Sequence, residues 1–236
     1  MKKNEQVSTP VIKRLPRYHR YLEELKRQGV VRISSKELSQ KMGLTASQIR
    51  QDLNCFGGFG QQGYGYNIEQ LYNEIGNILG LSSKFKAVLI GAGNLGHAIA
   101  THLRFEDRGF DLIGIFDNNP SVIGKKIGNK TVLSADSLEE FCKENKPSVA
   151  ILCIPSEYAD STAKMLVSLG IKGFWNFTQY DIATNFNGIA VENVHLGDSL
   201  MTLCYQINNI DNLDEEAKWK NWWILILLIL YLFPKV

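Results

Sequence analysis

Apolar residues recur with a helical period in the first part of the chain. A helix is predicted over residues 16–28, with Pro16 in its first turn and Gly29 after its end. S-S-K-E at 34–37 and T-A-S-Q at 45–48 have the form of capping boxes, each opening another short helix. Two short helices joined across M-G-L at 42–44 predict a helix-turn-helix.

The third predicted helix, from Thr45 to about Cys55, has two chemically different faces. Ile49, Leu53 and Phe56 follow i, i+4, i+7 spacing and are expected to pack inward. The opposite face holds side chains that can bond base edges and phosphates in a major groove. These are Ser47, Gln48, Arg50, Gln51 and Asn54.

The segment F-G-G-F-G-Q-Q-G-Y-G-Y at 56–66 combines five glycines with four aromatic residues. A flexible linker is typically Gly/Ser-rich and has little use for aromatic residues. The segment therefore predicts a hairpin that follows the recognition helix as a wing. An amphipathic connecting helix is expected over residues 67–79.

A different pattern begins at residue 85. The apolar run 85–90 predicts a strand, G-A-G-N-L-G at 91–96 matches G-x-G-x-x-G, and a helix is expected over 97–103. A second strand, 111–117, ends on Asp117, where a carboxylate suits the adenosine ribose hydroxyls. The pattern predicts an NAD(H) site, with coenzyme A as a weaker alternative. Its expected contacts are Gly91, Gly93, Asn94, Leu95, Gly96 and Asp117.

Further strands are predicted at 149–155, 171–177 and 188–194, with a helix ending near Leu169. Parallel sheets bind ligands at the carboxyl ends of their strands, so Pro155 and Phe177 are also expected near the cofactor. The predicted fold class is α/β, with an N-terminal winged-helix domain (1–80), a Rossmann domain (81–194) and a C-terminal helix with an apolar tail (195–236).

Charge is unevenly distributed along the 236 residues. Residues 1–60 hold twelve Lys/Arg against five Asp/Glu, whereas the remainder is acidic. A basic module on an acidic remainder favours a polyanionic partner. Four scattered cysteines, without metal-ligand spacing, predict neither a metal site nor a disulfide framework. The start lacks an apolar signal segment, so a cytoplasmic protein is expected.

The chain ends in an unusual apolar segment. Residues 222–233 are uncharged and apolar, but a helix of this length is shorter than the roughly 30 Å hydrocarbon core of a bilayer. A membrane span is not expected. An interfacial anchor, an oligomer contact and a tail without function all remain open.

Chemistry beyond nucleotide binding is not evident. The four histidines, His19, His97, His102 and His195, lie on predicted helices, and no substrate domain follows residue 210. Hydride transfer usually needs an acid–base group and a substrate pocket. We therefore expect a nucleotide sensor and no enzyme activity. The rival interpretation is a small NAD-dependent oxidoreductase, which turnover of simple aldehydes or alcohols would reveal.

This order of elements resembles the Rex family of redox-sensing transcriptional repressors. The resemblance rests on R-L-P-R-Y-H-R-Y-L-E-E-L at 14–25, S-Q-I-R-Q-D-L at 47–53 and F-G-Q-Q-G-Y-G-Y at 59–66, with G-A-G-N-L-G and F-W-N-F at 174–177. It covers about residues 10–210. Together with the recognition helix, it suggests DNA contacts from Arg14, Ser47, Gln48, Arg50, Gln51, Gly60 and Tyr66.

The resemblance implies a homodimer with swapped C-terminal helices that binds a palindromic double-stranded operator and releases it when NADH binds. It also implies a switch in which Arg20 pairs with a carboxylate at the start of the C-terminal helix. At the matching positions this chain has His195 for that aspartate and His102 for a tyrosine, with Asp198 one helical turn further on. A divergent Rex-like protein with an altered ligand response is therefore the alternative.

Overall fold

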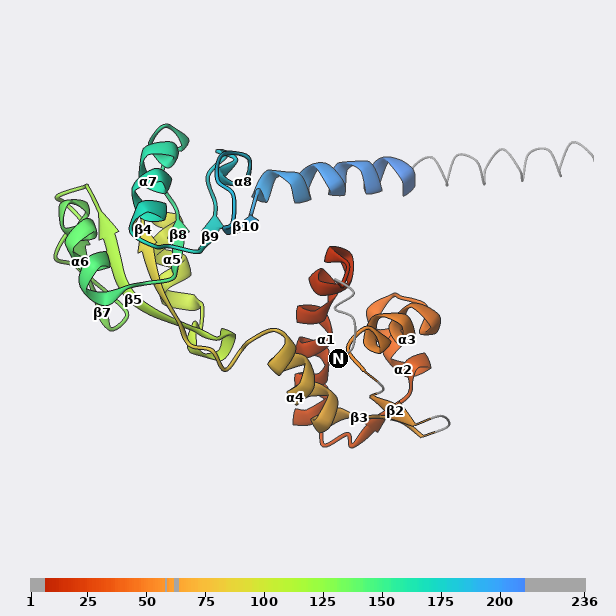
Figure 1. Cartoon of the computed structure of the whole chain (residues 1–236). Helices are drawn as coiled ribbons and strands as arrows, with labels where there is room; N and C mark the ends of the chain where they lie inside the picture. The colour runs from red at the N-terminus through yellow and green to blue at the C-terminus, as the bar shows by residue number, and fades with distance from the viewer. Residues whose placement is uncertain (1–6, 58, 62–63, 211–236) are drawn as a thin grey trace, which may run out of the picture. The chain divides into compact units, whose positions relative to one another are not determined.

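The computed structural model describes residues 7–57, 59–61 and 64–210, which form two compact units (Figure 1). The first unit contains the residues up to Lys86 together with His102–Leu112. The second contains Ala87–Thr101 and the residues from Ile113 onward. The predicted fold class, a winged helix joined to a Rossmann-type α/β domain, is confirmed.

The first helix, α1 (Thr9–Arg27), is longer than predicted. Pro10 occupies its first turn, and Pro16 lies inside the helix, so the prediction that Pro16 opens it was wrong. Proline lacks an N–H and removes one helical hydrogen bond. The helix continues through Pro16 because Val11, Leu15 and Tyr18 are buried at i, i+4, i+7 spacing.

Two short helices follow, α2 (Ser35–Met42) and α3 (Ala46–Asn54). The capping box at Ser34 and Glu37 is confirmed in both directions. Gly43 ends α2 with φ of +62°, a left-handed conformation that glycine adopts without strain. Thr45 accepts a hydrogen bond from the Gln48 N–H, but the second predicted box is only half formed. The Gln48 side chain instead bonds within the fold, as described below.

The predicted wing is a small antiparallel sheet. Its strands are β1 (Arg32–Ile33), β2 (Gly60–Gln61) and β3 (Gly65–Asn67), in the order β1-β3-β2. Helix α4 (Ile68–Ile78) follows, with the Asn67 side chain as its N-cap. One apolar core joins these elements, and its fully buried members include Tyr18, Leu22, Leu38, Ile49, Leu71 and Ile75.

The second half contains a seven-stranded sheet in the order β10-β9-β8-β4-β5-β7-β6. The strands are β4 (Phe85–Ile90), β5 (Phe110–Asp117), β6 (Lys126–Ile127), β7 (Lys130–Ser134), β8 (Val149–Leu152), β9 (Gly173–Asn176) and β10 (Ala190–Asn193). The pairs β4–β8, β8–β9, β9–β10 and β5–β7 are parallel, and β6–β7 is antiparallel. The order reverses beside β4, which is where open α/β sheets bind ligands.

The connecting helices are α5 (Asn94–His102), α6 (Leu138–Asn145), α7 (Ser156–Ser168) and α8 (Ile182–Asn185), with 3₁₀ turns η1 (Glu106–Arg108) and η2 (Ala135–Ser137). Helix α5 begins three residues before the predicted start, directly in the glycine turn. Strand β8 ends before its predicted bound because Pro155 is the N-cap of α7. A final helix spans residues 196–210.

Within the part of the chain that the structure describes, no helix is long and apolar enough to cross a membrane. The apolar segment 222–233 lies outside those residues.

Candidate DNA interface and nucleotide-binding turn

Helix α3 presents a polar face formed by the residues that the sequence singled out. Ser47, Arg50, Gln51 and Asn54 are exposed, whereas Ile49 and Leu53 are buried as predicted. The Arg50 guanidinium donates a hydrogen bond to Ser35 Oγ at 3.1 Å, which connects it to the first residue of α2. This face has the donors and acceptors that a major groove requires.

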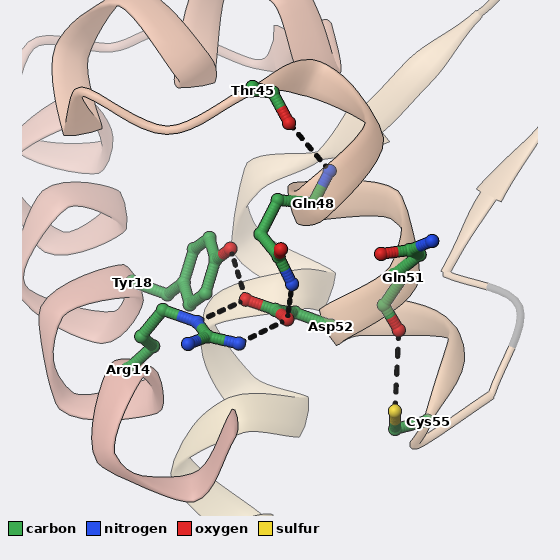
Figure 2. A network of polar contacts seen from close by, with 7 residues as sticks. All are labelled: Arg14, Tyr18, Thr45, Gln48, Gln51, Asp52 and Cys55. Carbon is green, nitrogen blue, oxygen red and sulfur yellow. Dashed lines mark hydrogen bonds and ion pairs between the residues drawn. The ribbon is translucent and has the colours of Figure 1, made fainter. Parts of the chain in front are cut away.

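Asp52 was not anticipated by the sequence analysis, yet it organises the inner side of this face (Figure 2). Its carboxylate is fully buried. Arg14 donates two hydrogen bonds to it, from Nε and Nη2, both at 2.7 Å. Tyr18 Oη donates at 2.9 Å and Gln48 Nε2 at 2.8 Å. The network therefore fastens α3 to α1.

The network also sets the charge states of its members. Burial raises the pKa of Asp52, but the hydrogen bonds from Arg14, Gln48 and Tyr18 outweigh it, and the pKa lies below its usual value. Burial and the bond to Asp52 raise the pKa of Tyr18. At neutral pH, Asp52 is ionised and can only accept hydrogen bonds.

Arg14 and Gln48, both predicted as DNA contacts, are thus engaged inside the protein. The Arg14 side chain is 28% exposed, so the protein does not enclose it completely. Gln48 is half-buried. Their DNA contacts stay predictions, but each would be made by a side chain whose position Asp52 sets.

The wing residues have different surroundings. Tyr66 is only 8% exposed and packs in the core of the first unit, so its DNA contact stays a prediction. Gly60 lies in β2, opposite Tyr66. A side chain at Gly65 would collide with the backbone of Ile33, which explains the glycine beside Tyr66.

The glycine turn after β4 is tightly built. Gly91 has φ of +97°, and a Cβ there would overlap the carbonyl of Cys153. A Cβ on Gly96 would overlap the Gly91 carbonyl oxygen. Gly93 differs, because a Cβ there would meet nothing within 4 Å. The first and third glycines are therefore needed for packing, whereas Gly93 leaves open space of the kind that a pyrophosphate could occupy.

Asp117 lies beside this turn at the end of β5. Its Oδ2 accepts from the Ala92 N–H at 2.6 Å, and its Oδ1 accepts from the Asn119 N–H at 2.7 Å. A carboxylate has about four acceptor positions. Asp117 therefore holds the turn and retains capacity for ribose hydroxyls.

The neighbouring strand ends carry the other predicted cofactor contacts. Backbone hydrogen bonds join Cys153 to Ile90 at 2.8 Å and Phe177 to Leu152 at 3.0 Å, which aligns the ends of β4, β8 and β9. Pro155 is exposed at the start of α7. Asn94 and Leu95, also exposed, begin α5. All eight predicted positions thus lie at one edge of the sheet.

Asn176 is a second buried polar residue that the sequence analysis missed. Its Nδ2 donates to the Tyr180 carbonyl at 2.8 Å and to Asn193 Oδ1 at 2.9 Å. Its Oδ1 accepts from the Thr178 hydroxyl at 2.8 Å. These bonds shape the loop that begins at Phe177. F-W-N-F contains this polar residue within an otherwise apolar strand, and that interruption was the available clue.

The predicted switch residues are all exposed. Arg20 lies on α1, and His102 ends α5. His195 Nδ1 lies 3.6 Å from Asp198 Oδ2, and the Asp198 N–H donates to the His195 carbonyl at 3.1 Å. The structure therefore brings His195 and Asp198 together at the start of the final helix. Among the described residues, no cluster suits a metal ion.

The final helix carries unusually exposed apolar side chains. Its large apolar residues are 48–69% exposed: Leu196, Leu200, Met201, Leu203, Tyr205, Ile207 and Ile210. Figure 1 shows this helix, in blue, extending away from β10. Five of these residues, at 196, 200, 203, 207 and 210, alternate spacings of four and three, the pattern of a helix–helix seam.

Comparison with known proteins identifies relatives of both halves. Residues 6–54 match the family described as "Putative DNA-binding protein N-terminus", and residues 82–180 match the CoA binding domain family. The chain is 56% identical over 208 residues to the redox-sensing transcriptional repressor Rex of Thermoanaerobacter pseudethanolicus, covering 88% of this chain and 92% of the relative. It is 54% identical over 211 residues to Rex of Clostridium perfringens, covering 89% and 99%.

Two solved structures extend the similarity to three dimensions. One is RSP in complex with β-NADH, with 51% identity, a TM-score of 0.81 and coverage of 89% of this chain and 98% of that one. The other is RSP in complex with β-NAD⁺ and operator DNA, with 55% identity, a TM-score of 0.81 and coverage of 90% and 97%. The relatives from Thermoanaerobacter pseudethanolicus and Clostridium perfringens are named as transcriptional repressors and not as enzymes. On this identity and coverage, the chain belongs to the Rex family of redox-sensing transcriptional repressors.

Proposed function

We propose that this protein is a transcriptional repressor that binds operator DNA and releases it when NADH binds. The observation that carries the proposal is the pairing, in one chain, of a polar recognition helix with a glycine turn beside Asp117. Relatives more than 50% identical have been solved with NADH, and with NAD⁺ and operator DNA. A ligand can act as such a switch only if it prefers the non-binding state.

The nucleotide proposed is NAD(H). The CoA binding domain family covers this half of the chain, but Asp117 favours a ligand with free ribose hydroxyls beside the turn. The turn from Gly91 to Gly96 would hold the pyrophosphate against its backbone at Gly93, near the amides that begin α5. The open space at Gly93 fits such a group. When bound, the nicotinamide ring would serve only as the signal, through being oxidised in NAD⁺ or reduced in NADH.

The test is operator binding measured by fluorescence anisotropy, on duplexes selected from a random pool. We expect release at low NADH and none at matched NAD⁺. Arg50→Ala should weaken binding by about 5- to 150-fold, the cost of one specific base contact. Arg104→Ala, an exposed arginine outside the helix-turn-helix, is the matched control. Binding that ignores both nucleotides would contradict the sensor proposal.

The switch would use the acidic group available at the start of the final helix. We propose that Asp198 takes the role of the carboxylate that pairs with Arg20, since His195 holds the corresponding position. Asp198→Asn should then change the NADH concentration needed for release by several-fold while leaving nucleotide binding intact. An unchanged release curve would contradict the role of Asp198.

We further propose that a second copy of the chain covers the apolar seam of the final helix. Leu203 and Ile207 are each 48% exposed, and a seam of this kind is stabilised by a partner surface. Leu203→Asp with Ile207→Asp should convert a dimer to a monomer, as measured by light scattering. Asn208→Asp, exposed on another side of the same helix, should leave the dimer intact.

A further inference from the structure

The side-chain amide of Gln48 is hydrogen-bonded inside the protein through its amino group, Nε2. Gln48 is the third residue of α3, in the turn that Thr45 caps. Recognition helices contact base edges mainly through their N-terminal residues, so this position faces the groove when α3 docks. Yet Gln48 Nε2 donates to Asp52 Oδ1 at 2.8 Å inside the protein.

The chemistry of Asp52 decides which end of the amide is held. An ionised carboxylate accepts hydrogen bonds and donates none. Asp52 stays ionised because Arg14 and Tyr18 donate three further hydrogen bonds to it. If the Gln48 amide turned over, its carbonyl oxygen would face a buried negative charge. Nε2 therefore faces Asp52, and Oε1 lies at the end away from it (Figure 2).

We infer that Asp52 makes Gln48 an acceptor toward DNA, so that the base it meets carries an amino group in the major groove. Those bases are adenine, through N6, and cytosine, through N4. Guanine and thymine present O6 and O4, which would oppose the Gln48 oxygen. This base preference rests on the proposed function and goes beyond it, since the names of the relatives mention no particular base.

An unrestrained glutamine would not discriminate in this way. Its amide can turn over at little cost and present either the oxygen or the amino group. Holding Nε2 against Asp52 removes that freedom, because the end of the amide that is turned away from Asp52 is then always Oε1. Asp52 is thus a positioning residue: it contacts no base, but it determines which end of the Gln48 amide faces the DNA.

The experiment compares wild-type protein with Gln48→Met and Gln51→Met, on operators in which each base pair is replaced in turn. Methionine keeps the length of the side chain but provides no strong donor or acceptor. We expect the wild type to prefer an amino-bearing base by about tenfold at one position per half-site. Gln48→Met should lose that preference, and Gln51→Met, an exposed glutamine on the same helix, should keep it.

Asp52→Asn supplies an independent measurement. Asparagine offers an NH₂ group that can donate to Gln48 Oε1, so the amide is free to turn over. The same position should then lose its preference or favour guanine or thymine, while preferences elsewhere remain. A thermal melt shows whether this variant folds, and the Gln48→Met result decides the inference if it does not.

Failure of the wild type to bind any duplex would overturn the proposed function, and this inference with it. Two results would overturn the inference alone while DNA binding stands. One is a keto preference at the position that responds to Gln48→Met. The other is a panel in which Gln48→Met alters no position.

Discussion

Gly96→Ala is expected to lower the stability of the Rossmann unit by about 2 kcal/mol or more and to reduce NADH affinity more than tenfold. The added Cβ would overlap the Gly91 carbonyl oxygen and approach the Gly91 carbonyl carbon at 3.0 Å. Both groups are backbone at the end of a buried strand, so the helix or the turn must move. Thermal melting and NADH fluorescence titration would measure the two effects.

Gly93→Ala is the matched control for this prediction. A Cβ there meets nothing within 4 Å, so the free energy of unfolding of the variant should lie within about 1 kcal/mol of the wild-type value. Its NADH affinity should nevertheless fall, because the methyl group occupies the space proposed for the pyrophosphate. Loss of stability at Gly93 equal to that at Gly96 would contradict the assignment of these roles.

Asp52→Ala is expected to destabilise the winged-helix unit by about 3 kcal/mol, the loss typical of a buried pair that is left half-formed. The variant leaves the buried Tyr18 hydroxyl without an acceptor and removes both hydrogen bonds from Arg14. DNA affinity should fall as well, because α3 is no longer fastened to α1. Chemical denaturation followed by circular dichroism would measure the stability, with Gln51→Ala as the exposed control on the same helix.

The stabilisation from Asp52 should depend on pH in a defined direction. The pKa of Asp52 is lowered in the folded state by its donors, despite its burial. Its contribution is therefore fully present above the unfolded value, near 3.9, and is lost as pH falls through the lower folded value. The stability difference between wild type and Asp52→Ala should be constant from neutral pH to about pH 5 and shrink below pH 4. A difference that grew on acidification would contradict the ionised network.

Local patterns were sufficient for most of the architecture. The caps at Ser34 and Thr45, the apolar spacing of α3 and the glycine turn all depend on residues close together in sequence. The expected nucleotide contacts lie at one edge of the sheet because parallel strands end together there. Each of these features follows from a rule that concerns a short window of sequence.

The features that sequence analysis missed depend on partners far along the chain. The sequence analysis assigned Asp52 no role, because its burial depends on donors 38 and 34 residues away. Tyr66 appeared to be part of an exposed wing but completes an apolar core. Pro16 looked like a helix start, yet burial of α1 on both sides of it maintained the helix. In each case tertiary packing overrode the local preference.

The Asp52 carboxylate limits which substitutions the winged-helix unit can accept during evolution. The buried carboxylate of Asp52 is stabilised by hydrogen bonds from Arg14, Tyr18 and Gln48. Replacing one of these four residues alone removes at least one of those hydrogen bonds and destabilises the groups that remain. Replacing Arg14 and Asp52 together by apolar residues of similar volume should cost far less than the sum of the two single replacements. These positions are thus expected to be inherited as a block, and drift in operator preference would proceed through Arg50 and Gln51, which lie outside it.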